Sequence, residues 1–356
     1  MIGVDERAAV DRVLRSGSLA QGPEVAAFES EFSAVVGDRH CVALNSGTSA
    51  LHVALLASGV GPGDEVIVPS FTFAATANAV RLTGAEPVFA DIDPSTYCLD
   101  PDAVDDAVNS RTAVIMPVHL YGHPADMARI GEIARRRGLL VIEDAAQAHA
   151  ASVGGRPVGS IGDAAAFSFY PTKNMTSAEG GMAVFADEAS ARTARLLRNQ
   201  GMDLPYQNEI VGFNLRMTDV HAAIGRVQLG RLTEFNRQRR ANAAALDAAF
   251  GGCDAVRVPV ELPGCTHVFH QYTIRSEQRH RIRELLEQSH VESRVFYPSG
   301  VHRLPPYAIP IETGSRRLPE TDRAAAQVLS LPVGPHVVGS ALQHLIETVA
   351  KVVGDL

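Results

Sequence analysis

Short β-branched runs alternate with helical patterns from about residue 40 to residue 190, and this alternation limits the possible folds more than any other feature. The runs HCVALN, DEVIVPS, EPVFADI, TAVIMPVHL, LLVIEDA, AAAFSFY and GMAVFAD are typical of buried strands, and amphipathic helical segments lie between several of them. Strands that alternate with helices predict an α/β fold with a mostly parallel central sheet and helices on both faces. Such sheets bind ligands at the carboxyl ends of their strands.

The second half of the chain predicts a smaller domain. A long helix, expected from about Thr218 to Phe250, is the best candidate for a connection between domains. Beyond it, a strand in HVFHQYTIR and a helix in RHRIRELLEQSH are typical of a small α+β unit. We therefore expect a large domain over residues 1–235 and a small C-terminal domain over residues 236–356.

Composition excludes several function classes. A formal net charge of -8, with arginines spread along the chain, argues against a nucleic-acid surface. The four cysteines, Cys41, Cys98, Cys253 and Cys265, fit neither a zinc site nor a disulfide framework, so no metal is predicted. No segment has the length and apolarity of a membrane span, and no signal-peptide pattern is present. The chain is expected to be soluble and cytoplasmic.

Lysine is almost absent, because all of the 32 basic residues except Lys173 and Lys351 are arginines. Lys173 lies among aromatic and apolar residues in FSFYPTKNMTSAEGG, a setting that lowers the pKa of an amine and lets it attack a carbonyl. Arginine cannot form such an imine. Lys173 is therefore the candidate nucleophile, whereas Lys351 has no chemical groups near it in the C-terminal helical pattern.

A carboxylate follows the apolar strand in LLVIEDAAQAH. Asp144 is expected at the carboxyl end of this strand, where burial requires a positive partner, and a protonated ring nitrogen would serve. Gln147 would lie one turn further on the same side if this turn is helical. The alternative is a helix cap followed by a surface glutamine.

The segment NSGTSALHVAL opens a helix with small and hydroxyl residues. Backbone N–H groups near Gly47 and Thr48 could bind a phosphate, although an ordinary N-cap is the alternative that this segment alone favours. Ser168 lies in a strand that should end at the same edge. Phosphate site, buried Asp144 and imine-forming Lys173 together suggest pyridoxal 5'-phosphate as the cofactor.

Five segments resemble the DegT-type sugar aminotransferases that use this cofactor and belong to aminotransferase fold type I. They are NSGTSALHVALLASGVGPGDEVIVPSFTFAATANAV, VHLYGHPADM, VIEDAAQAHAA, GDAAAFSFYPTKNMTSAEGGM and GFNLRMTDVHAAIGRVQL, and the match covers nearly the whole chain. The resemblance implies that Lys173 forms the internal aldimine and shuttles the proton. The other implied cofactor contacts are Asp144 at the ring nitrogen, Gln147 near the ring face or phenolic oxygen, Gly47, Thr48 and Ser168 at the phosphate, and Phe73 stacked on the ring.

The same resemblance implies a homodimer with active sites at the subunit interface. Asn214 would then contact the phosphate of the partner's cofactor, and Arg216 would meet substrate phosphates. His270, Tyr297 and His302 fall in segments that face the sugar in relatives, and a structural role is an equal alternative for each.

The predicted reaction is a ping-pong transamination. Glutamate or glutamine would donate the amino group, and a keto sugar linked to a nucleoside diphosphate would accept it. A cyclic ketone, as in aminocyclitol or aminobenzoate-precursor formation, is an alternative acceptor. A non-catalytic sensor on the same fold is a third interpretation. Lys173 argues against the branch of the family that carries histidine at this position and removes a hydroxyl group.

Overall fold

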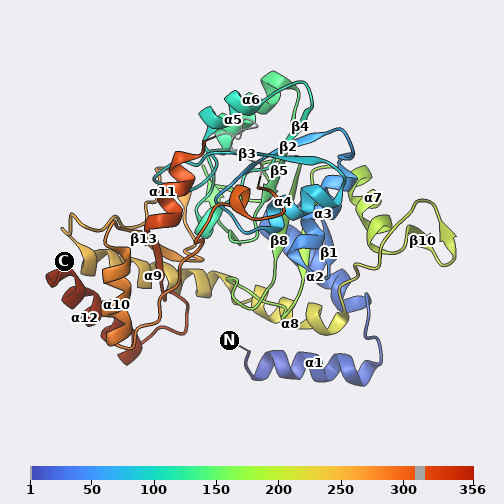
Figure 1. Ribbon diagram of the computed structural model, residues 1–356. Helices are drawn as coiled ribbons and strands as arrows, with labels where there is room; N and C mark the ends of the chain where they lie inside the picture. Colours follow the sequence, from blue (N-terminus) through green and yellow to red (C-terminus); the bar gives the residue numbers. More distant parts are fainter. Residues whose placement is uncertain (1, 309–316) are drawn as a thin grey trace.

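A seven-stranded sheet lies at the centre of the part of the chain that the computed structural model describes, residues 2–308 and 317–356 (Figure 1). The strand order is β1-β9-β8-β5-β4-β2-β3, and all neighbours pair in parallel except β9, which is antiparallel to β1 and β8. The predicted mostly parallel sheet is confirmed. The strands are β1 (His40–Leu44), β2 (Glu65–Pro69), β3 (Glu86–Ala90), β4 (Thr112–Ile115), β5 (Leu140–Asp144), β8 (Ala164–Ser168) and β9 (Gly181–Phe185).

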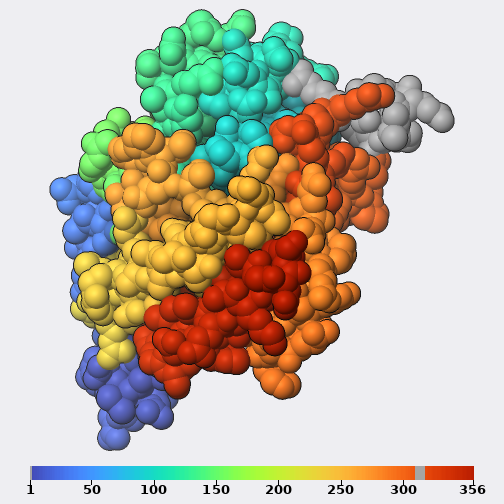
Figure 2. Space-filling view, turned by 90° about the vertical axis from the view of Figure 1, so that its left-hand side faces the viewer, coloured from blue at the N-terminus to red at the C-terminus, as the bar shows by residue number. Residues whose placement is uncertain are grey.

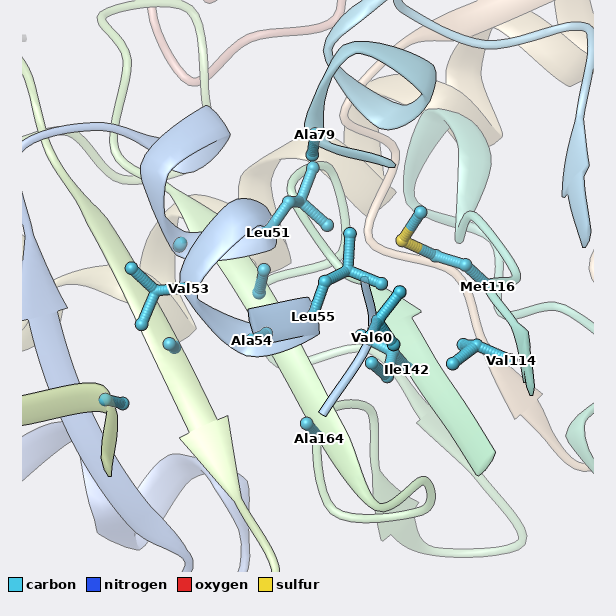
Figure 3. Close-up of a cluster of buried hydrophobic side chains, with 14 of the residues drawn as sticks. Leu51, Val53, Ala54, Leu55, Val60, Ala79, Val114, Met116, Ile142 and Ala164 are labelled. Carbon is cyan, nitrogen blue, oxygen red and sulfur yellow. The ribbon is translucent and has the colours of Figure 1, made fainter. Parts of the chain in front are cut away.

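Successive side chains of each strand point to opposite layers of helices, as the two-residue period of a strand requires. Val42 and Leu44 of β1 pack in the cluster beneath α3, whereas Cys41 and Ala43 pack in the cluster beneath α2. Figure 3 shows the first cluster, where α3 side chains lie against the strands. One layer contains α3 (Gly47–Ala57), α4 (Ala75–Leu82) and α7 (Glu188–Arg198), and the other contains α2 (Pro23–Ser33), α5 (Pro101–Ala107) and α6 (Met127–Arg137).

Aspartates at the ends of loops determine where three of these helices begin. The side chains of Asp100, Asp126 and Asp187 accept hydrogen bonds from backbone N–H groups in the first turns of α5, α6 and α7. A cap of this kind stabilises a helix by about 1 kcal/mol. The three arginines of the last turn of α6 lie at its carboxyl end, where positive charge complements the helix dipole.

The helix predicted from Thr218 to Phe250 is two helices, so that prediction was wrong in its continuity. Thr218 caps α8 (Asp219–Leu229) as expected, and α9 (Leu232–Phe250) follows after a break. Gly230, a poor helix former, ends α8, and Arg231 has φ of -106° and ψ of -5°, away from helical averages. Arg231 also donates a hydrogen bond to Glu6 of the first helix, which holds the chain at the break.

A separate hydrophobic cluster lies among the C-terminal elements. Figure 2 shows the last helix lying across α9 on one face of the molecule. Part of this region packs elsewhere, because Ala324, Ala325 and Val328 join the cluster beneath α5 and α6. The domain boundary between residues 235 and 236 stays a prediction. The elements are α10 (Arg279–Gln288), α11 (Pro319–Gln327), α12 (Ser340–Gly354), and the antiparallel pair β13 (Tyr272–Arg275) and β14 (Val328–Leu331).

The first helix, α1 (Val4–Ser16), lies apart from the sheet and along α8 (Figure 1). No helix in residues 2–308 and 317–356 has the length and apolarity needed to cross a membrane. The remaining short strands form two small sheets, β10 (Met202–Leu204) with β11 (Gln207–Asn208), and β12 (Cys265–Thr266) with β6 (Ser152–Val153) and β7 (Arg156–Pro157).

Candidate active site

A cavity of about 480 Å³ lies at the carboxyl ends of the parallel strands. Gly47 follows β1, Phe73 follows β2, Asp144 ends β5, Ser168 ends β8, and Lys173 lies in the turn after β8; all five line this cavity. The structure therefore brings together residues that are up to 126 positions apart in the sequence at the edge where parallel sheets bind ligands. We call it the first cavity.

The beginning of α3 provides a site for an anion. The side chain of Ser46 caps the helix, and the first-turn N–H groups of Gly47 and Thr48 point along the helix axis toward the cavity, where the positive end of the helix dipole lies. A Cβ atom at Gly47 would lie 2.6 Å from Cβ of Ser168, so only glycine lets the helix begin against β8. Gly181 is similarly required, because its Cβ would lie 2.2 Å from the carbonyl oxygen of Ser46.

Replacing Gly47 by alanine is expected to weaken binding of pyridoxal 5'-phosphate to the apoprotein about 10- to 100-fold. The added methyl group must push α3 away from Ser168, and such overpacking costs about 1–3 kcal/mol. Fluorescence titration measures the dissociation constant. Gly61→Ala is the matched control, because a Cβ at Gly61 meets no atom within 4 Å. Equal affinities of the wild type and Gly47→Ala would contradict this account of the α3 terminus.

Asp144 is buried at the end of β5, with 4% of its surface exposed. Its Oδ2 accepts a hydrogen bond from Oγ1 of Thr76 at 2.8 Å, and its Oδ1 accepts one from the backbone N–H of Ala146 at 3.2 Å. Burial raises the pKa of Asp144, and these donors and the charge of Lys173 offset only part of that rise. A buried carboxylate whose charge is only partly compensated favours a positively charged ligand.

Thr76 is a residue of the cavity for which no role was predicted from the sequence. Its hydroxyl donates to Asp144, and it lies 3.0 Å from the hydroxyl of Thr72. Both threonines line the first cavity. Two hydroxyl residues spaced four apart, directly after a buried strand, were a signal that could have indicated a polar helix face at this edge. The loop that carries Phe73 is thereby tied to Asp144.

Lys173 is half-buried, and its backbone N–H donates to the carbonyl of Tyr170 at 2.9 Å, which closes the turn after β8. Burial lowers the pKa of Lys173 from 10.5 to about 8, while the nearby carboxylate of Asp144 acts in the opposite direction. About one amine in ten is then neutral at pH 7. A neutral amine in a partly desolvated site is a nucleophile and a base.

The reactivity of Lys173 in the apoprotein is expected to rise with pH and to level off above about pH 8. Below that pKa the amine is mostly protonated, and its neutral fraction grows about tenfold per pH unit. The rate of labelling by pyridoxal 5'-phosphate, trapped with borohydride and located by peptide mapping between pH 6 and pH 10, measures this dependence. The exposed Lys351 is an internal control in the same digest. A rate that kept rising to pH 10 at Lys173 would show an ordinary lysine.

Gln147 and Tyr297 meet at one wall of the cavity. Oε1 of Gln147 accepts a hydrogen bond from the backbone N–H of Tyr121 at 2.7 Å, and its Nε2 donates to the hydroxyl of Tyr297 at 3.1 Å. Phe73 has 61% of its surface exposed, and its ring centroid lies 6.2 Å from that of Tyr297. An exposed aromatic face in a cavity that also contains a buried carboxylate suits a planar ring. Tyr121, whose role was not predicted, lies in the quoted segment VHLYGHPADM.

Two of the predicted substrate contacts differ in their surroundings. His270 lines the first cavity, and its Nδ1 lies 3.3 Å from Oδ1 of Asn174; burial is the largest cause that holds its pKa well below the usual value. His302 is not among the residues that line the cavity. Its Nδ1 lies 2.6 Å from the hydroxyl of Ser70, within a contact between the segment around residue 301 and the end of β2.

Asn214 and Arg216 lie outside the first cavity of their own chain. Asn214 is exposed and forms a bridge with Asn199, whose Oδ1 accepts a hydrogen bond from Nη1 of Arg216 at 2.9 Å. This arrangement leaves the predicted contacts across a subunit interface as predictions. Among the described residues, no group of three or more His, Cys, Asp or Glu side chains could hold a metal ion.

Known proteins resemble this chain over almost its full length. A sequence model of the DegT/DnrJ/EryC1/StrS aminotransferase family matches residues 1–350. The dTDP-3-amino-3,4,6-trideoxy-alpha-D-glucose transaminase of Streptomyces venezuelae is 43% identical over 347 residues, with 97% of this chain and 91% of that protein covered.

Solved structures give the same result. DesV of S. venezuelae, in complex with a ketimine intermediate, superimposes with a TM-score of 0.94 and 41% identity over 98% of this chain and 94% of that one. The structure of 3-amino-5-hydroxybenzoic acid synthase superimposes with a TM-score of 0.92 and 33% identity over 100% of this chain and 98% of that one.

Proposed function

The chain belongs to the DegT/DnrJ/EryC1/StrS aminotransferase family, and from that premise we infer that it transfers an amino group to a keto sugar linked to a nucleoside diphosphate. The predicted family and fold class are confirmed. One observation carries the function: the amine of Lys173 and the buried carboxylate of Asp144 line the same cavity. Imine chemistry needs the first group, and a pyridinium nitrogen needs the second.

The residues of the first cavity fit pyridoxal 5'-phosphate. Gly47, Thr48 and Ser168 would hold its phosphate, because Gly47 leaves the space that a Cβ would fill and α3 presents free N–H groups there. Phe73 would lie on the face of the ring, and Asp144 would hold a proton on its nitrogen. When bound, this cofactor takes up the electron pair that is released as a proton leaves the substrate carbon beside the amine.

Lys173 moves the proton in both halves of the reaction. Its Nζ, neutral in a useful fraction because its pKa is about 8, would accept the proton from the carbon of the amino donor. The resulting ammonium would return a proton in the second half, when the keto sugar receives the amine. A single residue can serve as both base and acid because its pKa lies near the working pH. Glutamate or glutamine is the proposed donor.

Gln147 and Tyr297 would orient the reactants within the cavity. Gln147 is held at both ends, by the backbone of Tyr121 and by the hydroxyl of Tyr297, so its amide cannot turn freely. Burial raises the pKa of Tyr297, which keeps its hydroxyl protonated. His270 remains neutral at physiological pH for the same reason. These groups would hydrogen-bond to sugar hydroxyls without adding charge.

The proposed assembly is a homodimer in the cytoplasm. The segment from β10 to Phe213 exposes several large apolar side chains, including Tyr206 at 96% and Val211 at 90%. An exposed apolar patch of this kind is typical of an interaction site. Asn214 and Arg216 follow this segment directly in the chain. If a second copy of the chain covers the segment, Asn214 and Arg216 would lie near the first cavity of that second copy. The mass in solution, from light scattering, tests the dimer.

A cyclic ketone is the second candidate acceptor, favoured by the similarity to 3-amino-5-hydroxybenzoic acid synthase. One experiment separates the candidates. The protein is first incubated with excess glutamate, so that it takes up the amine, and the glutamate is then removed. It is next incubated with a panel of nucleotide-linked keto sugars and with cyclic ketones, and the products are identified by mass spectrometry. An aminated nucleotide sugar supports the proposed function. Amination of the cyclic ketones alone would replace the proposed acceptor with a cyclic ketone. If neither class of ketone receives the amine, the protein would be a sensor.

A further inference from the structure

A second cavity, of about 660 Å³, adjoins the first. Lys173, His270 and Gln271 line both cavities, so the second one reaches the same reactive amine. Its other walls include α9, which supplies Arg239, the segment over residues 292–294, and the loop over residues 332–336 that follows β14. The transamination derived above uses only the first cavity, which leaves the second without a role.

Arg239 is a buried cation in the wall of this second cavity, with 7% of its surface exposed. Its Nη1 donates to the carbonyl oxygens of Phe269 and His270 at 3.1 and 3.2 Å, and its Nε is buried without a hydrogen-bond partner. Within the described part of the chain no carboxylate acts on its charge, since burial is the only cause of its pKa shift. Burial lowers its pKa to about 10, so it remains charged at neutral pH.

An unpaired buried charge is unfavourable, because burial removes it from water without a compensating partner. The other arginine of this cavity does not share the problem, because Arg294 is exposed and pairs with Glu292. Arg239 therefore has an uncompensated charge and a buried donor without a partner, and its side chain lines a space large enough for an amino acid. A carboxylate satisfies both, since guanidinium groups bind carboxylates through paired N–H donors.

We propose that the second cavity binds a carboxylate of the amino donor through the guanidinium group of Arg239. This inference rests on the proposed function, because it assigns one of that reaction's two substrates to a site. The donor would lie with its amino end toward Lys173 and its carboxylate toward α9. The nucleotide of the acceptor would then occupy the first cavity and its approach, so the two substrates would share the reactive amine and differ in the remaining contacts.

Glutarate is a suitable probe, because it has the carboxylates of glutamate without the reactive amine. Isothermal titration of the apoprotein with glutarate is expected to show binding that weakens about tenfold or more in Arg239→Gln. Arg294→Gln is the matched control, which removes an arginine from the same cavity wall and is expected to change the dissociation constant less than about twofold. In the protein loaded with pyridoxal 5'-phosphate, Arg239→Gln should raise the glutamate concentration needed for half-maximal reaction, and in the amine-bearing form it should leave the keto-sugar half-reaction unchanged.

Equal glutarate affinities of the wild type and Arg239→Gln would overturn the inference. If circular dichroism shows that this variant does not fold, crystals of the wild type soaked with glutarate decide: a carboxylate on Arg239 supports the site, and its absence there overturns it. The proposed function fails separately. Glutarate bound at Arg239 without amination of any sugar would remove the function alone, whereas sugar amination with binding independent of Arg239 would remove only this site.

Discussion

Turnover is expected to fall by at least about 10²–10⁴-fold in a Lys173→Ala variant, the range attributed to one general acid–base group. The loss should affect both half-reactions equally, because in the proposed mechanism the same nitrogen takes the proton from the donor and returns it for the acceptor. Stopped-flow absorbance measures the half-reaction with glutamate, and mass spectrometry measures sugar amination. Borohydride trapping should find no labelled peptide from residues 167–181.

Lys351→Ala is the matched control for this variant. It removes the other lysine of the chain, which is exposed on α12, and should leave turnover unchanged. The folded state should tolerate Lys173→Ala, since a partly desolvated amine with a lowered pKa contributes no ion pair that stabilises the fold at neutral pH. A Lys173→Ala protein with wild-type turnover would exclude the proposed chemistry.

The residues that the sequence predicted well are those whose position follows from a strand end. Asp144 ends β5 and Ser168 ends β8, and parallel pairing brings both strand ends to one edge. Lys173 was identified by its chemistry, since an arginine-rich chain has retained an amine in an apolar turn. Local sequence contains both kinds of information, because strand periodicity and side-chain type are properties of short segments.

The contacts that the sequence could not predict join segments far apart in the chain. Thr76 meets Asp144 across 68 positions, and Gln147 meets Tyr297 across 150. These two contacts depend on how α4 and the C-terminal segment pack on the sheet, which no local sequence pattern describes. His302, for which a sugar contact and a structural role were equal alternatives, lies beside Ser70 and does not line the first cavity, because its surroundings depend on how its segment packs at the end of β2.

Neighbouring carboxylates at the end of β5 are expected to respond in opposite ways to neutralisation. Burial raises the pKa of Asp144 in the folded apoprotein. The fold is therefore most stable below the pKa that Asp144 has in the unfolded chain, and it loses stability as the pH rises through the pKa that Asp144 has in the folded protein. Burial acts in the same direction on Glu143, but His119 and backbone N–H groups donate to its oxygens and lower its pKa below 4.5. The charge of Glu143 therefore stabilises the fold above the ordinary pKa of a glutamate, and this stabilisation is lost as the pH falls through the lowered pKa.

Asp144→Asn is expected to reduce turnover about 10²–10³-fold, the effect of removing one preorganised charge from a reacting centre. The asparagine keeps the shape of the side chain and can still accept a hydrogen bond from Thr76, but it cannot hold a proton on the ring nitrogen.

At pH 7 the apoprotein of Asp144→Asn should melt no lower than the wild type, because a buried charge has been removed. Pyridoxal 5'-phosphate should raise the melting temperature of this variant less than that of the wild type. Glu143→Gln, as the control, should lower the melting temperature of the apoprotein, because the charge that its hydrogen-bond donors stabilise is lost. If Asp144→Asn lowered the apoprotein's melting temperature as Glu143→Gln does and kept wild-type turnover, Asp144 would be a structural residue.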